Sequence, residues 1–178
     1  SVLPKKPFSY SISIVDKIDT LVGFFIIDEK PTSSKDPFAL RRAAIGLLRI
    51  IIENKLSFKL RDLISYAIRL YQEQGVEIKN EKTEQQVLEF IKERMRNVLK
   101  LKNIKNDIIE ASVSSHAGDN FLALYAKTLL MNKYKNKGIG LNAINSYKRA
   151  SNILDKAGKR ITGRPDAVLF RKDEEKIL

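Results

Sequence analysis

Three arginines interrupt the apolar stretch between residues 37 and 53, and they are the first candidates for a binding site. Arg41, Arg42 and Arg49 fall within an arc of roughly 100° when the stretch is read as an α-helix. A guanidinium presents a planar fork of donors that matches a phosphate group. Charges are costly to desolvate on an apolar helix, so two roles are open. The arginines face phosphates, or they pair with acids on neighbouring helices.

A second cationic pair lies near the other end of the chain. Lys148 and Arg149 are adjacent, and Asn152 follows one helical turn later. Tyr147 precedes them, and its ring could stack on an unpaired base or pack in a core. Both readings of Tyr147 fit the helical spacing.

Few residues in this sequence are of the types and spacings that enzymes use for catalysis. Cysteine is absent, which excludes disulfides and thiolate sites and fits a reducing compartment, and no glycine-rich nucleotide motif is present. The only histidine, His116, sits in a serine-rich loop and is interpreted as solvent-exposed. Asp16 and Asp19 lie one helical turn apart and are interpreted as a solvated patch paired with Lys17 or with arginines elsewhere. We therefore expect no catalytic residue and no metal ligand.

The charge distribution favours a polyanionic partner. The formal net charge is +12 at pH 7, and ten basic residues between 127 and 164 face a single acid, Asp155. Ordinary solvated lysines would explain part of this excess. No stretch approaches the roughly 18 uncharged apolar residues of a membrane span, and no signal peptide is visible.

Apolar periodicity predicts an all-α fold, a bundle-like array of six to eight helices without a significant sheet. A short β-branched run at 24–27 could instead form a strand. Asp36 is expected to be the N-cap of the second helix with Pro37 at its first position, and this helix is expected to be buried on most sides. Residues 135–140 are expected to form a loop. The predicted helices are 10–27, 37–53, 59–74, 83–100, 105–113, one ending near 134, and 141–156.

Four segments together closely resemble the β subunit of bacterial glycyl-tRNA synthetases. They are VDKIDTLVG (15–23), KPTSSKDPFALRRAA (30–44), LLRIIIE (47–53) and KRASNIL (148–154). Members of that family usually carry glycine at the positions of Ile26, Asp28 and Ser33, so the loop after the first helix is expected to be stiffer or differently turned here. Lys35 lies inside the second segment, directly before Asp36 and Pro37.

The resemblance implies a domain plan. Residues 1–30 would be the end of an HD-type helical domain, 31–157 a central helical region, and 158–178 a basic and then charged tail. The start at Ser1 without a methionine fits an internal piece of a longer subunit. Asp16 matches the last acidic position of the HD signature, whose other metal ligands are not in this sequence. Metal binding is therefore not expected here.

The resemblance also implies a function. In this family the α subunit activates glycine with ATP and Mg²⁺, and the β subunit supplies much of the tRNA recognition in a cytoplasmic heterotetramer. The chain itself would be non-catalytic and would hold no cofactor, with tRNA(Gly) and the α subunit as partners. Two alternatives remain: a remnant of an HD-type phosphohydrolase, and a structural module that docks the α subunit. The candidate tRNA-binding residues are Lys35, Arg41, Arg42, Arg49, Lys148, Arg149 and Asn152.

Overall fold

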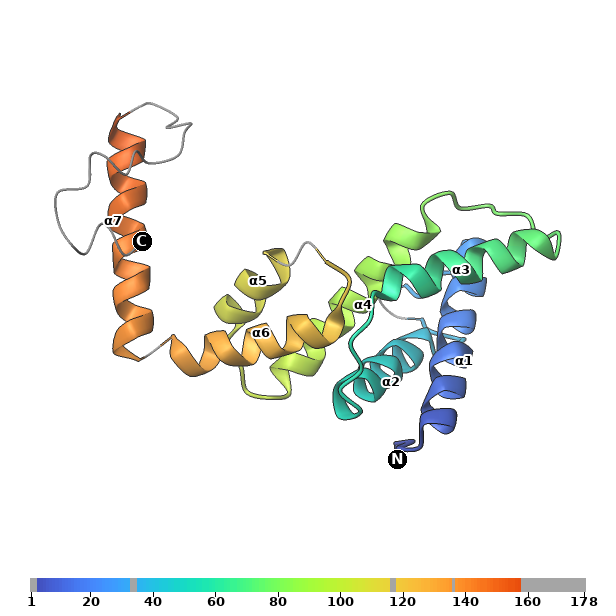
Figure 1. The fold of residues 1–178 in the computed structure, drawn as a ribbon. Coiled ribbons are helices and arrows are strands. Elements are labelled where there is room, and N and C mark those ends of the chain that lie inside the picture. Colours follow the sequence, from blue (N-terminus) through green and yellow to red (C-terminus); the bar gives the residue numbers. More distant parts are fainter. Residues whose placement is uncertain (1–2, 33–34, 116–117, 136, 158–178) are drawn as a thin grey trace, which may run out of the picture. The chain divides into compact units, whose positions relative to one another are not determined.

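The computed structural model describes residues 3–32, 35–115, 118–135 and 137–157, and this part of the chain contains seven helices and no strand (Figure 1). The prediction of an all-α fold is confirmed. The helices are α1 (Pro7–Ile26), α2 (Leu40–Glu53), α3 (Leu60–Glu73), α4 (Thr83–Lys100), α5 (Asn106–Ser114), α6 (Phe121–Tyr134) and α7 (Gly138–Ala157).

The chain divides into two compact units, Ser1–Tyr134 and Lys135–Leu178. Helices α1 to α6 form the first unit, in which α1 packs against α2, α3 and α4, and α6 packs against α2 and α5. In the second unit the structure describes α7. The expected domain limits at residues 30 and 157 stay predictions, and the predicted tail, 158–178, lies outside the described residues.

Helix α1 supplies one wall of the core in the first unit. Its predicted apolar face is buried as expected, and the chain stays helical to Ile26, so the strand reading of residues 24–27 is wrong. Burial of these side chains against neighbouring helices is the main source of helix stability in a domain of this size. The buried residues of this face are Ile14, Ile18, Leu21, Val22 and Phe25.

Helix α2 begins three residues later than predicted. Its N-cap residue is Ala39, which takes a left-handed conformation with φ of 56°, and Pro37 lies in the preceding turn. Asp36 still caps the helix, because its carboxylate accepts hydrogen bonds from the backbone N–H of Leu40 at 2.8 Å and of Arg41 at 3.1 Å. The aspartate side chain thus caps the helix, but Asp36 lies three residues before the N-cap position at which it was predicted.

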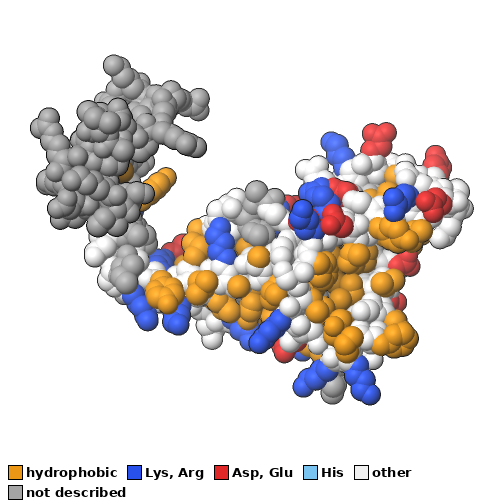
Figure 2. All heavy atoms as spheres, in the orientation of Figure 1, with side chains coloured by type: hydrophobic (Ala, Val, Ile, Leu, Met, Phe, Trp, Pro, Cys, Tyr) orange, Lys and Arg blue, Asp and Glu red, His pale blue; other side chains and the backbone are white. Residues whose placement is uncertain are grey.

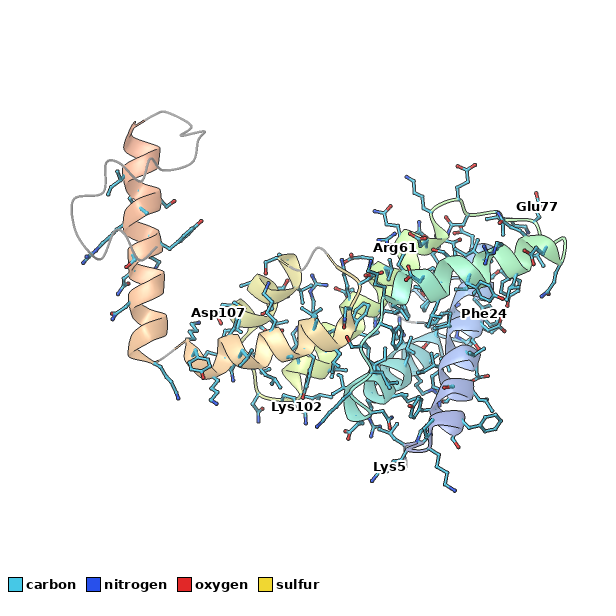
Figure 3. The ribbon with its side chains drawn as sticks, viewed as in Figure 1. Lys5, Phe24, Arg61, Glu77, Lys102 and Asp107 are labelled. Atoms are coloured by element: carbon cyan, nitrogen blue, oxygen red, sulfur yellow. The ribbon has the colours of Figure 1, made fainter. Side chains whose placement is uncertain are left out.

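The loop before α2 is fixed on both sides. The ring of Phe38 stacks on Phe24 of α1 with centroids 4.0 Å apart, and the Arg41 guanidinium donates to the backbone carbonyl of Thr32 (Figure 3). Asp28, a position where the family resemblance implies glycine, has a φ of 66°. The positive φ gives a backbone reason for glycine at this position.

Helix α2 is buried or half-buried at every position except Arg42, Arg49 and Glu53, which share one narrow side, so the expectation that it is buried on most sides is confirmed. One further expectation needs correction. Helix α7 starts at Gly138, inside the predicted loop. Glycine lowers helix propensity by about 1 kcal/mol, but a long continuous helix behind it outweighs that cost.

Helices α1 and α3 approach each other closely at Gly23. A Cβ atom at this position would lie 2.6 Å from the hydroxyl oxygen of Tyr71 on α3. That hydroxyl donates to the backbone carbonyl of Asp19 at 3.4 Å. Burial, and after it the nearby Asp19 carboxylate, raise the pKa of Tyr71 to about 12. The absence of a side chain at Gly23 therefore sets the spacing of the two helices.

Candidate nucleic-acid interface

The predicted arginine cluster of α2 separates into two groups. Arg42 and Arg49 are seven residues apart, which places them on the same side of the helix, and both line one surface cleft. Arg41 lies about 80–100° further round the helix and donates to the carbonyl of Thr32, where it holds the loop before α2. Its role in binding tRNA stays a prediction.

A lysine from α1 completes the cleft. Lys17 lies on the wall opposite Arg42 and Arg49, and its ammonium nitrogen is 3.0 Å from the Ser13 hydroxyl. The cleft has a volume of about 460 Å³. Its remaining wall residues are apolar or glycine: Leu3, Pro4, Ile45, Gly46 and Ile50. Three cations from two helices thus surround one opening, a suitable arrangement for an anion.

The alternative role for the arginines was pairing with acids on neighbouring helices. Neither Arg42 nor Arg49 forms an ion pair with any carboxylate of the described residues. Other arginines do so: Arg61, labelled in Figure 3, pairs with Glu84, and Arg96 contacts Glu110 at 3.2 Å. Within the described residues, Arg42 and Arg49 are therefore exposed cations without a carboxylate partner.

Lys17 was missed as a site residue, because sequence spacing cannot bring it to α2. One signal was available: Gly46 interrupts an apolar helix between Arg42 and Arg49, and an isolated glycine there often marks a close approach by another element. In the structure that element is Lys17, whose Cε would lie 2.9 Å from a Cβ at Gly46.

Helix α7 presents the second cationic pair. Lys148, Arg149 and Asn152 are all exposed, and their positions fall within an arc of roughly 100° on this helix. Tyr147 is 74% exposed, so the core reading of this residue is wrong and its ring is accessible. This group belongs to the second compact unit.

The other singled-out residues are Lys35, Asp16 and His116, and the tRNA-binding role of Lys35 stays a prediction. Lys35 is exposed in the loop before α2, where its backbone N–H donates to the Thr32 hydroxyl at 3.2 Å. Asp16 is exposed and lies 3.7 Å from the Lys17 ammonium, as the sequence interpretation expected. His116 lies outside the described residues. Across the described ranges, no group of three or more histidine and acidic side chains could hold a metal ion.

An apolar groove runs between α1 and α3. Figure 2 shows hydrophobic side chains gathered over these two helices. The groove has a volume of about 440 Å³ and is lined by residues that include Val15, Leu63, Tyr66 and Leu70. Each of these four side chains is at least 37% exposed. No helix among the described residues is long and apolar enough to cross a membrane.

Comparison with known proteins places the chain in a family. Residues 1–114 match the family model for the glycyl-tRNA synthetase beta subunit. The glycine–tRNA ligase beta subunit of Rickettsia canadensis (strain McKiel) is 40% identical over 167 residues, which cover 94% of this chain and 24% of the relative. The corresponding subunit of Ruegeria sp. (strain TM1040) is 33% identical over 158 residues, covering 89% of this chain and 21% of that protein.

The beta subunit of Dinoroseobacter shibae (strain DSM 16493 / NCIMB 14021 / DFL 12) is 33% identical over 204 residues, which cover 99% of this chain and 28% of the relative. The chain thus spans about a quarter of the length of the curated relatives it matches. The family model covers well over half of the chain, and the relatives match nearly all of it. This chain belongs to the glycyl-tRNA synthetase beta-subunit family.

Proposed function

We propose that this chain is a tRNA-binding part of a glycine–tRNA ligase and supports the attachment of glycine to tRNA(Gly). The observation that carries the proposal is the accessible pair Arg42 and Arg49, which face solvent without an acidic partner in the described part of the chain. Because the chain belongs to the glycyl-tRNA synthetase beta-subunit family, tRNA is the nucleic acid to which such cations would bind.

The chemistry of the proposed role is phosphate recognition. Arginines on a rigid helix hold backbone phosphates and position the RNA, while base identity is read mainly by other contacts. Lys148, Arg149 and Asn152 on α7 would add a second set of phosphate contacts, and the exposed Tyr147 ring would stack on an unpaired base. Lys35 and Arg41 would contribute from the loop that precedes α2.

The chemical step of aminoacylation would take place on another subunit. Glycine activation with ATP and Mg²⁺ would belong to the α subunit, and the two subunits together would form the ligase in the cytoplasm. The chain itself would contribute neither a nucleophile nor a cofactor site. Its effect on aminoacylation would act through tRNA affinity and orientation.

The test is tRNA binding by the complete ligase over a range of salt concentrations. Replacing Arg42 and Arg49 with alanine removes two phosphate contacts, so the slope of log K against log salt should become shallower by about 0.9 per contact on duplex RNA. The matched control replaces Lys79 and Lys102, which are exposed and lie outside the cleft. The proposal fails if both double variants retain the affinity and salt slope of the wild type.

A parallel pair of variants tests helix α7. Lys148→Ala together with Arg149→Ala should also flatten the salt dependence, whereas Tyr147→Ala should weaken binding to single-stranded regions without changing the slope. A uniform loss in both variants would instead indicate that α7 had been disrupted, which the helical signal in circular dichroism reports.

A second candidate function rests on the apolar groove between α1 and α3. Exposed apolar side chains from two helices form a continuous surface there, typical of a docking site for a partner helix. We propose the α subunit as the partner. Leu70→Glu should then weaken subunit association without changing tRNA affinity per assembled complex, and the association should be insensitive to salt. Unchanged association in this variant would remove the groove from the interface.

A further inference from the structure

The cleft between α1 and α2 is shaped around one specific contact. The aliphatic stem of Lys17 crosses α2 at Gly46, and a Cβ at this glycine would lie 2.9 Å from Cε and 3.6 Å from Cδ of the lysine. Gly46 lies between Arg42 and Arg49 in the sequence of α2. The missing side chain therefore lets the stem of Lys17 cross α2 within the cleft that Arg42 and Arg49 also line.

The position of Lys17 is held from its own helix as well. The ammonium nitrogen lies 3.0 Å from the Ser13 hydroxyl, one turn earlier on α1, and the side chain is only 23% exposed. The nearest acid is Asp16, whose carboxylate is 3.7 Å away and whose side chain is 71% exposed. Because the Asp16 carboxylate is solvent-exposed and 3.7 Å away, this ion pair is weak and leaves most of the ammonium's charge available.

No carboxylate lines the cleft itself. Three like charges around one opening repel each other unless an anion lies between them. Arginine offers fork-shaped pairs of donors, and lysine offers a compact point charge with three donors. A tetrahedral oxyanion can accept hydrogen bonds from all three side chains at once, whereas a planar carboxylate has fewer oxygens to share among them.

We infer that Lys17, Arg42 and Arg49 form a pocket for one backbone phosphate of RNA, and that Gly46 is required because it admits the lysine. This inference rests on the proposed function and deepens it. It assigns a binding role to Lys17 and a positioning role to Gly46. It also distinguishes a defined phosphate pocket from a diffuse positive surface.

The decisive variant leaves the charge unchanged. Gly46→Ala adds one methyl group that displaces the Lys17 stem, and the alanine favours the helix, so the chain should fold. A diffuse surface would not respond to this substitution. A phosphate pocket should lose roughly tenfold in RNA affinity, because one charge-assisted hydrogen bond is broken or lengthened. Gly138→Ala is the matched control, since a Cβ at Gly138 meets nothing within 4 Å.

The experiment titrates the complete ligase that contains this chain, as wild type and variants, with a tRNA(Gly) transcript at several salt concentrations. Lys17→Ala should lower the RNA affinity but change the slope of log K against log salt by much less than about 0.9, because Arg42 and Arg49 still contact the same phosphate, and Lys17→Arg should restore part of the affinity. Lys102→Ala, which removes one exposed charge outside the cleft, should leave both quantities nearly unchanged. Inorganic phosphate should compete with the transcript more weakly in Gly46→Ala than in the wild type.

The outcomes separate the pocket from the proposed function. If the wild-type ligase binds the transcript but Gly46→Ala and Lys17→Ala behave like Gly138→Ala and Lys102→Ala, the pocket is overturned and the tRNA-binding role stands. If the wild-type ligase shows no salt-dependent binding, both are overturned. Competition by free phosphate without any effect of the variants on RNA affinity would assign the cleft to a small phosphate ligand and overturn the RNA pocket.

Discussion

The close approach of α1 and α3 gives the sharpest prediction for stability. Gly23→Ala places a methyl group 2.6 Å from the hydroxyl oxygen of Tyr71 and 3.1 Å from the ring carbon that bears it. Neither distance is tolerable for a carbon without movement of the ring or of the helix. The substitution is otherwise favourable, because Gly23 lies inside a helix with ordinary backbone angles.

The expected magnitude follows from two opposing effects. Alanine stabilises a helix interior by about 1 kcal/mol relative to glycine. Overpacking of this kind costs about 1–3 kcal/mol. The hydrogen bond from Tyr71 to the Asp19 carbonyl is long at 3.4 Å, so its loss adds little. Gly23→Ala should therefore lower the free energy of unfolding by about 1 kcal/mol, and the melting temperature should fall by about 2–4 °C.

The clash can be relieved on the other helix. In a Tyr71→Phe background the hydroxyl is gone, and the nearest ring atom must move by only a few tenths of an ångström. Gly23→Ala should be neutral or stabilising there, and the two substitutions should be coupled by about 1–3 kcal/mol. Urea unfolding of the four proteins, followed by circular dichroism, measures this coupling. If Gly23→Ala has the same effect in both backgrounds, the steric explanation is refuted.

Three further predictions concern other contacts. Asp36→Ala should lower the free energy of unfolding by about 1 kcal/mol, because two backbone N–H groups at the start of α2 lose their acceptor. The measurement compares the melting temperature of this variant with that of Asp36→Asn, and an unchanged melting temperature in Asp36→Ala would contradict the capping role. The folded state raises the pKa of Tyr71 to about 12, so the unfolded chain loses this proton at a lower pH than the folded chain does. The free energy of unfolding should therefore fall as the pH rises from about 10 to about 12, and it should fall more steeply than in Tyr71→Phe. If the urea midpoints of the two proteins change with pH by the same amount, this prediction is wrong. Glu110→Gln should cost less than about 1 kcal/mol, because Glu110 is 54% exposed and Arg96 keeps other acidic neighbours; a larger loss that persists in high salt would show that the contact is not a surface ion pair.

Much of the fold was predictable from local sequence. The apolar positions of α1 and the limits of α4 follow helical spacing closely, because each helix buries one continuous face. The start of α2 was missed because Ala39 takes a left-handed conformation, which its residue type does not indicate. The first turn of α7 was missed because Gly138 and Gly140 resemble loop residues when read in isolation.

The candidate site was only partly predictable. A spacing of seven residues was enough to put Arg42 and Arg49 on one side of α2. The same pattern could not separate Arg41 from them, because the contact with Thr32 depends on the loop conformation. Lys17 joins the cleft through the packing of α1 on α2, which is a tertiary contact. Sequence spacing therefore identifies residues on one helix, whereas a cleft needs the neighbouring helix.

Gly46 has a consequence for any effort to make this protein more heat-resistant. Alanine at this position would favour the helix, and the flexible stem of Lys17 could move aside, unlike the fixed ring that opposes Gly23. A library sorted for thermal tolerance alone should therefore enrich Gly46→Ala and reject Gly23→Ala. The enriched clones would be more robust and poorer at holding RNA. Comparing the fates of these two glycines would show whether the glycine at position 46 is needed for packing or only for binding.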